Sequence, residues 1–230
     1  MDRLFKTTIL FRPRDAASAQ TVLVGQDDPT VDVDAVQSAV DQGGSVLLLG
    51  TFDFGNDGRV LLQKDVAISG EADASGRPIT TIVGGDWPFV APTPADMSPA
   101  QTGPMISIES IHFSEPLGGA IQLVYTGGAY IRGNRLTQVR KRSFTAFFRH
   151  TGVLIGPRDA FLTTTLGARV VTGSILVIDN EVHLTNPDPT LTAAIGVFVH
   201  PIDGADVYVA RNLITCCARG CQDCSRSRAA

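Results

Sequence analysis

The sequence predicts an all-β solenoid, a protein built from stacked coils of short strands, and three observations support this. The first is a recurring row of residues in which Ile or Val stands three positions before an Asn and Leu, Val or Ile two positions after it, at Asn134, Asn180 and Asn212. Rows at 66–71 and 106–113 repeat the apolar columns without the Asn. The second is their spacing, which fits a coil of about 22 to 24 residues with enlarged loops. The third is composition, because 23 Gly and only 7% aromatic residues suit many short strands joined by turns.

The Asn at a fixed place in these rows has a backbone explanation. Asn tolerates the left-handed conformation, and its side chain hydrogen-bonds nearby main-chain groups, so it suits a sharp bend between two strands. Asn134, Asn180 and Asn212 are therefore predicted to be structural bend residues. Because the interval from Asn134 to Asn180 is twice a coil, a row without Asn is expected between them at 153–158, with Glu71 and Ile111 taking the Asn position in the earlier rows.

Residues 1–20 are predicted to be a disordered N-terminal segment, because Arg12-Pro13-Arg14-Asp15 interrupts the apolar stretch that a signal peptide needs. A short strand at 21–24 precedes a helix over about 33–41, capped by Asp32 and ended by Gly43-Gly44. A buried strand follows at 45–49. Further strands are predicted at 60–62, 80–83, 120–124, 146–148, 168–171 and 195–199. A large loop at 84–104, rich in Pro and Gly, contains the only Trp, Trp87.

The block Val36-Gln-Ser-Ala-Val-Asp-Gln-Gly-Gly-Ser-Val-Leu-Leu-Leu-Gly-Thr-Phe52 resembles the N-terminal part of right-handed parallel β-helix proteins of the pectate-lyase-like superfamily. In these proteins a short amphipathic helix covers the first coil, which would otherwise expose apolar residues and unpaired strand edges. The resemblance extends to about Ile214. It implies an all-β, single-stranded right-handed parallel β-helix of about six or seven coils with an N-terminal capping helix. An antiparallel sandwich is the alternative fold.

Charge and cysteine content narrow the classes of function. A formal net charge of -4 argues against a nucleic-acid partner, which would require a basic face. No apolar run is long enough to predict a membrane span. Cys216, Cys217, Cys221 and Cys224 all lie in an irregular tail at 216–230, beyond a β-helix domain at 21–215. They offer only one CxxC pair, so no metal site is assigned. The resemblance favours an extracellular or cell-envelope location, although the sequence shows no convincing signal peptide.

Alternation within the predicted strands identifies outward side chains, which stack in columns on the surface of a solenoid. Ile121 and Leu123 are expected to face inward and Gln122 outward. Arg149, Arg169 and His200 are expected on the same face as Gln122, where a basic column would suit an acidic polysaccharide; solvated surface charge is the alternative interpretation. These three are the candidate catalytic residues, and Gln122, Trp87 and Tyr130 are the candidate substrate-binding residues.

Three functions are left open by the sequence. The first is binding of an acidic polysaccharide without catalysis. The second is a polysaccharide lyase. Lyases of the superfamily that this chain resembles remove the proton next to a uronate carboxylate, often with Arg or Lys as the base and with calcium to neutralise the acid. No acidic cluster for that metal and none of the family's catalytic motifs is found here, and no other cofactor is indicated. The third is a structural or assembly solenoid that meets a partner or another copy through an apolar outer face carrying Tyr130, Leu176, Ile178 and Tyr208.

Overall fold

The structure is a computed structural model that describes residues 20–92, 102–140, 150–156, 171–186, 194–199, 204–218 and 227–228. The described strands form three sheets. Sheet A comprises β1 (Thr21–Val24), β2 (Gly44–Leu49), β5 (Val66–Gly70), β8 (Met105–Glu109), β11 (Gly128–Arg132), β14 (Gly173–Ile178) and β17 (Ala205–Ala210). Sheet B comprises β3 (Thr51–Asp53), β6 (Thr81–Val83), β9 (His112–Ser114), β12 (Arg135–Thr137), β15 (Glu181–Asn186), β18 (Leu213–Ala218) and β19 (Ser227–Arg228). Sheet C comprises β4 (Val60–Leu61), β7 (Phe89–Ala91), β10 (Ile121–Leu123), β13 (His150–Ile155) and β16 (Ala194–Val199).

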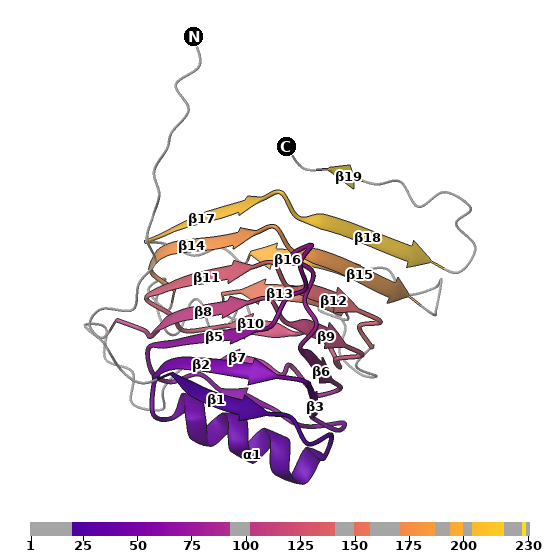
Figure 1. Ribbon diagram of the computed structural model, residues 1–230. Helices are drawn as coiled ribbons and strands as arrows, with labels where there is room; N and C mark the ends of the chain where they lie inside the picture. Colours follow the sequence, from indigo (N-terminus) through magenta and orange to yellow (C-terminus); the bar gives the residue numbers. More distant parts are fainter. Residues whose placement is uncertain are drawn as a thin grey trace.

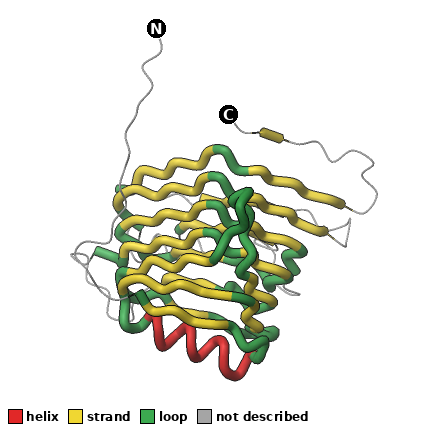
Figure 2. The backbone as a smooth tube through the Cα atoms, viewed as in Figure 1, coloured by secondary structure: helices red, strands yellow, loops and turns green. Residues whose placement is uncertain are grey.

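From β2 onward the chain passes through sheets A, B and C in turn, so each strand pairs with its equivalent one coil away (Figure 1). The pairing is parallel throughout, except that β19 adds to β18 in the antiparallel direction. Stacked rungs of strands joined by turns result (Figure 2). The prediction of an all-β parallel solenoid is confirmed at this level.

Strict alternation of inward and outward side chains builds the core. In sheet A, for example, Ile106, Ile108, Ala129 and Ile131 are fully buried inside the coils. Ile121 and Leu123 of β10 are likewise fully buried, as the sequence predicts. These inward residues belong to a single apolar cluster that extends along the solenoid, so burial of stacked aliphatic side chains is the main stabilising contribution.

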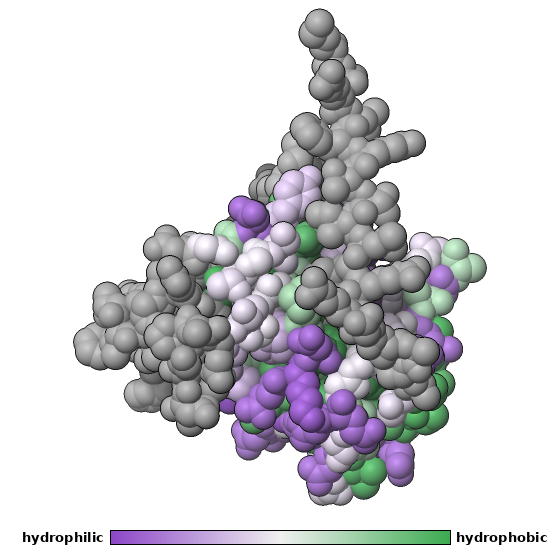
Figure 3. Space-filling view, turned by 90° about the vertical axis from the view of Figure 1, so that its left-hand side faces the viewer, coloured by the Kyte–Doolittle hydropathy of each residue, from purple (hydrophilic) through white to green (hydrophobic). Residues whose placement is uncertain are grey.

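Helix α1 (Pro29–Val40) covers the end of the solenoid where the described chain begins (Figures 1 and 2). It starts before the predicted residue 33, because Asp28 is the N-cap and accepts a hydrogen bond from the Thr30 N–H, while Pro29 fits the first turn. Asp32 is therefore not the cap. Its buried carboxylate instead accepts hydrogen bonds from main-chain N–H groups of Gln26, Asp28 and Asp53, which tie the helix to β3. On the side where the sheet A strands begin, hydrophilic side chains gather in the half nearest α1 (Figure 3).

One position in the predicted Asn column is wrong at Glu71. The carbonyls that accept a hydrogen bond from the first residue of β6, β9, β12, β15 and β18 belong to Gly50, Thr80, Ile111, Asn134 and Asn180 in turn. Thr80 therefore takes the place assigned to Glu71. The residues between Glu71 and Thr80 form a loop that projects from the coil. An antiparallel bridge between Ala72 and Pro78 closes its base.

The row predicted at 153–158 is also wrong, because Val153 and Ile155 lie in β13 of sheet C and pair with Ile121 and Leu123. Asn134 and Asn180 are consequently in adjacent coils.

The segment 84–104, predicted to be one loop, contains β7. At the other end, β18 continues to Ala218, into the region predicted to be an irregular tail.

Candidate functional site

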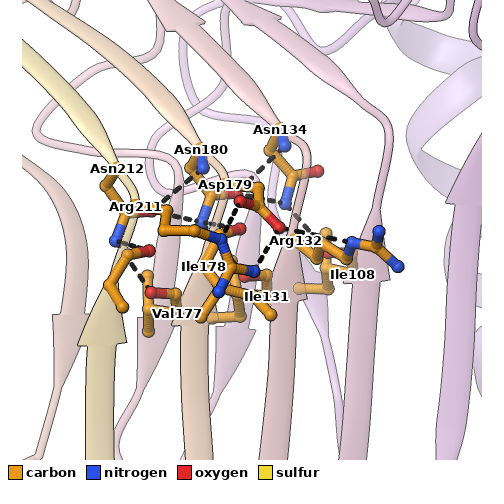
Figure 4. Close-up of polar contacts among 11 residues, drawn as sticks. Ile108, Ile131, Arg132, Asn134, Val177, Ile178, Asp179, Asn180, Arg211 and Asn212 are labelled. Atoms are coloured by element: carbon orange, nitrogen blue, oxygen red, sulfur yellow. Dashed lines mark hydrogen bonds and ion pairs between the residues drawn. The ribbon is translucent and has the colours of Figure 1, made fainter. Parts of the chain in front are cut away.

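The three Asn form a hydrogen-bonded ladder at the bend between sheets A and B (Figure 4). The Asn180 Oδ1 atom accepts hydrogen bonds from the Asn134 main-chain N–H at 3.0 Å and from the Asn134 side-chain amide at 3.1 Å. Asn212 Oδ1 accepts the same pair of bonds from Asn180, at 3.0 and 2.9 Å. The side-chain amides also donate to main-chain carbonyls, including those of Ile108, Ile131 and Val177. Because these buried amides are occupied by the chain itself, the ladder holds the bend rather than a ligand.

The residue before each Asn adopts a left-handed conformation: Gly133, Asp179 and Arg211 have φ angles of 61°, 57° and 53°. This geometry directs Asp179 and Arg211 to the surface of the bend (Figure 4). Arg211 Nε and one of its terminal nitrogens donate to the two carboxylate oxygens of Asp179 at 2.7 and 2.8 Å, and Arg132 Nε lies 3.7 Å from Asp179. The Arg211 hydrogen bonds, aided by the charges of Arg211 and Arg132, lower the pKa of Asp179.

Beside this network runs an outward column of sheet A in which Tyr130, Leu176 and Tyr208 pair in register. Tyr208 is 58% exposed, and Tyr130 and Leu176 are partly exposed. We call these three residues together with Arg132, Asp179 and Arg211 the tyrosine–arginine face. Tyr130, one of the predicted substrate-binding residues, therefore lies on a surface that combines aromatic rings with guanidinium groups.

Sheet B carries a second polar group of side chains, which we call the histidine–glutamate cluster: His112, Arg135, Thr137, Glu181, His183 and Thr215. Glu181 accepts contacts from both sides, with Arg135 Nε at 3.2 Å and His183 Nε2 at 2.5 Å. The other ring nitrogen of His183 lies 2.5 Å from the Thr215 hydroxyl, and His112 Nε2 lies 2.8 Å from the Thr137 hydroxyl.

Electrostatics within this cluster favour an ionised Glu181 and a neutral His112. Burial alone would raise the pKa of Glu181, but the His183 hydrogen bond and the charges of His183 and Arg135 lower it overall. Burial lowers the pKa of His112, and the positive charges of Arg135 and Arg77 lower it further. Both ring nitrogens of His183 are engaged, one with Thr215 and the other with Glu181, so its imidazole is held in place.

The predicted catalytic residues Arg149, Arg169 and His200 lie outside the described residues. In the described part of sheet C, Gln122 pairs with Val90 on one side and Leu154 on the other, and Leu154 pairs with Phe198. The expectation that Arg149, Arg169 and His200 line the face of Gln122 stays a prediction.

Gln122 and Trp87 are both buried, at 8% and 2% exposure. Trp87 packs with Val90 and Leu154 in a small apolar cluster on the outside of sheet C, separate from the main core. Its ring also lies against Gly118 and Gly119, where a Cβ atom would come within 3 Å of the indole. In this structure Trp87 contributes packing; its role in substrate binding, like that of Gln122, stays a prediction.

Within the described part of the chain, no group of three or more His, Cys, Asp or Glu has the geometry to hold a metal ion. Two surface acids of the described residues, Asp179 and Glu181, are ion-paired with arginines. None of the helices among the described residues is long and apolar enough to cross a membrane.

Comparison with known proteins gives no further assignment: no protein-family model, curated protein or solved structure matches this chain. The fold and the surface define the class of this protein as an all-β parallel solenoid. Its tyrosine–arginine face and its histidine–glutamate cluster lie on either side of the asparagine ladder.

The histidine–glutamate cluster was missed by sequence reasoning, although a signal for it exists. Residues one and three positions after each ladder Asn face outward, which gives Arg135 and Thr137, then Glu181 and His183. Finding the cluster required knowing that Asn134 and Asn180 are in adjacent coils, which their long separation concealed.

Proposed function

We propose that this protein binds an anionic polysaccharide along the tyrosine–arginine face. The observation that carries the proposal is the stacking of Tyr130 and Tyr208 in one outward column beside Arg132 and Arg211. Aromatic rings give flat apolar surfaces for the faces of sugar rings, and guanidinium groups donate paired hydrogen bonds to carboxylates. Rigid strands hold both kinds of group in place, which reduces the entropy lost on binding.

The spacing of the column suits an extended chain of sugars. Tyr130 and Tyr208 stand two strands apart, or roughly 10 Å at the usual strand separation. A saccharide lying across the strands can therefore contact each tyrosine with a different ring. Leu176 between them provides an apolar contact, so the surface continues from one tyrosine to the other.

Arg132 is the best candidate for recognising acidic groups. Its side chain is 52% exposed and lies 3.7 Å from Asp179, whereas Arg211 already forms a two-point contact with the same carboxylate. Arg132 can thus turn donors toward a ligand while Asp179 and Arg211 hold their position. Since the whole chain carries a net charge of -4, attraction of a polyanion depends on this local surface and is expected to weaken with added salt.

A polysaccharide lyase is a second candidate, favoured by the arrangement of the histidine–glutamate cluster. Arg135 can neutralise the carboxylate of a uronate, and His183 backed by Glu181 can accept the proton next to it. A substrate would first have to displace Thr215 from the imidazole, and any calcium would be bound together with the substrate. Binding without catalysis is therefore the stronger proposal, and a structural or assembly role is what remains if no saccharide binds.

The sheet order supports the finer fold assignment that we propose, a right-handed parallel β-helix of about six or seven coils in the pectate-lyase-like superfamily. Connections between parallel strands of one sheet are right-handed in about 98% of cases. An extracellular or cell-envelope location, where such polymers occur, is part of the same proposal.

Calorimetric titration with polygalacturonate and with its fully methyl-esterified form tests the binding proposal. The acidic polymer should bind and the esterified one should bind weakly or not at all. Arg132→Ala should weaken binding about tenfold, as expected for losing a charged hydrogen bond. Lys64→Ala is the control, since it removes one exposed positive charge away from this face. Equal binding of both polymers, or equal loss in both variants, would refute the proposed site.

The same mixtures test the lyase alternative. Unsaturated products that absorb ultraviolet light should appear, with and without added calcium, if the protein is a lyase. Loss of that signal in both Arg135→Ala and His183→Ala would locate the reaction in the histidine–glutamate cluster. Binding without any product would remove this candidate.

A further inference from the structure

The end of the solenoid opposite α1 exposes apolar residues that are buried in earlier coils. Val209 is 37% exposed, although its partner Val177 in the neighbouring strand is fully buried. Val199 is 38% exposed, whereas its partner Ile155 is fully buried. At the other end α1 buries Val36, Ala39 and Val40 against the first coil. Among the described residues the two ends therefore differ: a helix covers one, and apolar side chains are exposed at the other.

Strand β17 is the last strand of sheet A in the sheet order, and none of the described strands pairs with its other edge (Figure 1). Carbonyls of Gly204 and Ala210 accept hydrogen bonds from the preceding coil. Because main-chain groups of successive strand residues point in opposite directions, those of Val207 and Val209 face the open edge. Such an edge is a template for another strand. Neighbouring β18 has its edge at Leu213 and Ile214 already paired with antiparallel β19, so antiparallel addition at this end of the molecule has a precedent within the chain.

We propose that the edge of β17 is a dimer interface at which a second copy of this chain adds its own β17 in the antiparallel direction. A second copy is the occupant that the sequence of the strand favours, because Ala205–Ala210 is complementary to itself when reversed. Two identical edges related by a two-fold axis give a closed dimer rather than a filament.

The register follows from the directions of the main-chain groups. With Tyr208 opposite the partner's Tyr208, Val207 lies opposite the partner's Val209, and these residues can exchange both hydrogen bonds of a closely spaced pair. The two valines meet on the inner side, where they bury the apolar surface that is now exposed. Asp206 faces the partner's Ala210, so the two aspartates are kept apart and no like charges oppose one another.

This dimer would extend the outer surface as well as the core. Sheet A would continue from one copy into the other, and the column Tyr130, Leu176 and Tyr208 would continue into the partner's Tyr208. The inference goes beyond the proposed function and does not depend on it, because the interface forms through main-chain and inward-facing groups without any saccharide.

Sedimentation equilibrium of the full chain without saccharide, over a wide concentration range and with reductant to exclude disulfides, tests the interface. The chain should be in equilibrium between monomer and dimer. Val209→Lys should weaken the dimer about tenfold or more, because it places a charge in the paired edge. Val22→Lys is the matched control, since Val22 is a 51% exposed valine of β1 at the other end. Circular dichroism should show that both variants are folded.

Hydrogen exchange supplies a second measurement that needs no variant. In the wild-type chain, exchange at the Val207 and Val209 amides should slow as concentration rises through the dimer transition, while the Tyr208 amide, which faces β14, stays protected throughout. A chain that is monomeric at all concentrations overturns the proposal, as does equal weakening by Val22→Lys. Growth to species larger than the dimer would overturn the closed two-fold arrangement.

Discussion

The outer faces of sheets B and C have the same backbone geometry but very different side chains. On sheet C, Val90, Gln122 and Leu154 stack in one outward column, and all three are buried. On sheet B, His112, Arg135 and Glu181 stack in the equivalent way and remain partly exposed. The first column forms a small second core around Trp87, whereas the second forms a network of ion pairs and hydrogen bonds.

This difference shows that a side chain that points out of the coil is not always exposed to a ligand. Alternation correctly predicts that Gln122 points out of the coil, yet Gln122 is buried, in the same outward column as Val90 and Leu154, which pack with Trp87. A functional site is therefore better sought at the bend between sheets A and B and on sheet B, where outward side chains are both polar and exposed.

Trp87→Ala should produce the largest effect and is the strongest test of the second core. Removing a buried indole is expected to lower the free energy of unfolding by about 3 to 5 kcal/mol. Urea denaturation measures it. Tyr208→Ala, which removes an exposed ring on sheet A, should cost less than about 1 kcal/mol. Similar losses in the two variants would show that the outer side of sheet C is no more packed than the other faces.

Asn180→Ala should have the next largest effect, at the bend that positions sheet B relative to sheet A. It removes bonds to both Asn134 and Asn212 and leaves buried main-chain groups without partners, so a loss of about 2 to 4 kcal/mol is expected. Asn212→Ala should cost less, since Asn212 bonds only one ladder Asn. Equal losses in thermal or urea unfolding would mean that the ladder does not act cooperatively along the solenoid.

Much of this fold could be predicted from the sequence, because parallel coils repeat the same steric demands. An inward apolar residue at every second position and a left-handed bend before each Asn leave a readable pattern. The pattern fails where a residue other than Asn occupies the bend. Thr80 takes the bend position with its hydroxyl donating to the Leu48 carbonyl, so Glu71, which begins the surface excursion, was assigned to the column instead.

The candidate site was harder to predict because it depends on contacts between distant segments. The Glu181–Arg135 ion pair joins residues that are far apart in the sequence, and no local spacing reveals it. The burial of Trp87 depends on the absence of side chains at Gly118 and Gly119, which lets the indole lie against their main chain. Such packing becomes visible only when the register of all three sheets is known.

Thr151→Val should stabilise the protein by about 1 kcal/mol, since the Thr151 hydroxyl is buried without a hydrogen-bond partner and Val has nearly the same shape. Thr126→Val is the matched control. The Thr126 hydroxyl is also buried, but it bonds the carbonyls of Pro104 and Gly128 at 2.7 and 2.8 Å, so its removal should destabilise. Changes of the same sign in urea unfolding would show that a hydrogen-bond partner does not decide whether a buried hydroxyl here stabilises the fold.

The smallest predicted effect is a dependence of stability on pH that originates in the polar face of sheet B. The pKa of His112 is lowered by burial and by Arg135 and Arg77, so below its ordinary value of 6.5 the unfolded chain binds a proton that the folded chain resists. Stability should therefore be constant above that pH, fall as the pH drops through it, and level off below the folded pKa. His112→Asn, which keeps a donor for Thr137 but cannot titrate, should flatten this part of the curve measured by urea unfolding between pH 7 and 5. Acid sensitivity that is unchanged in His112→Asn would assign it to another group.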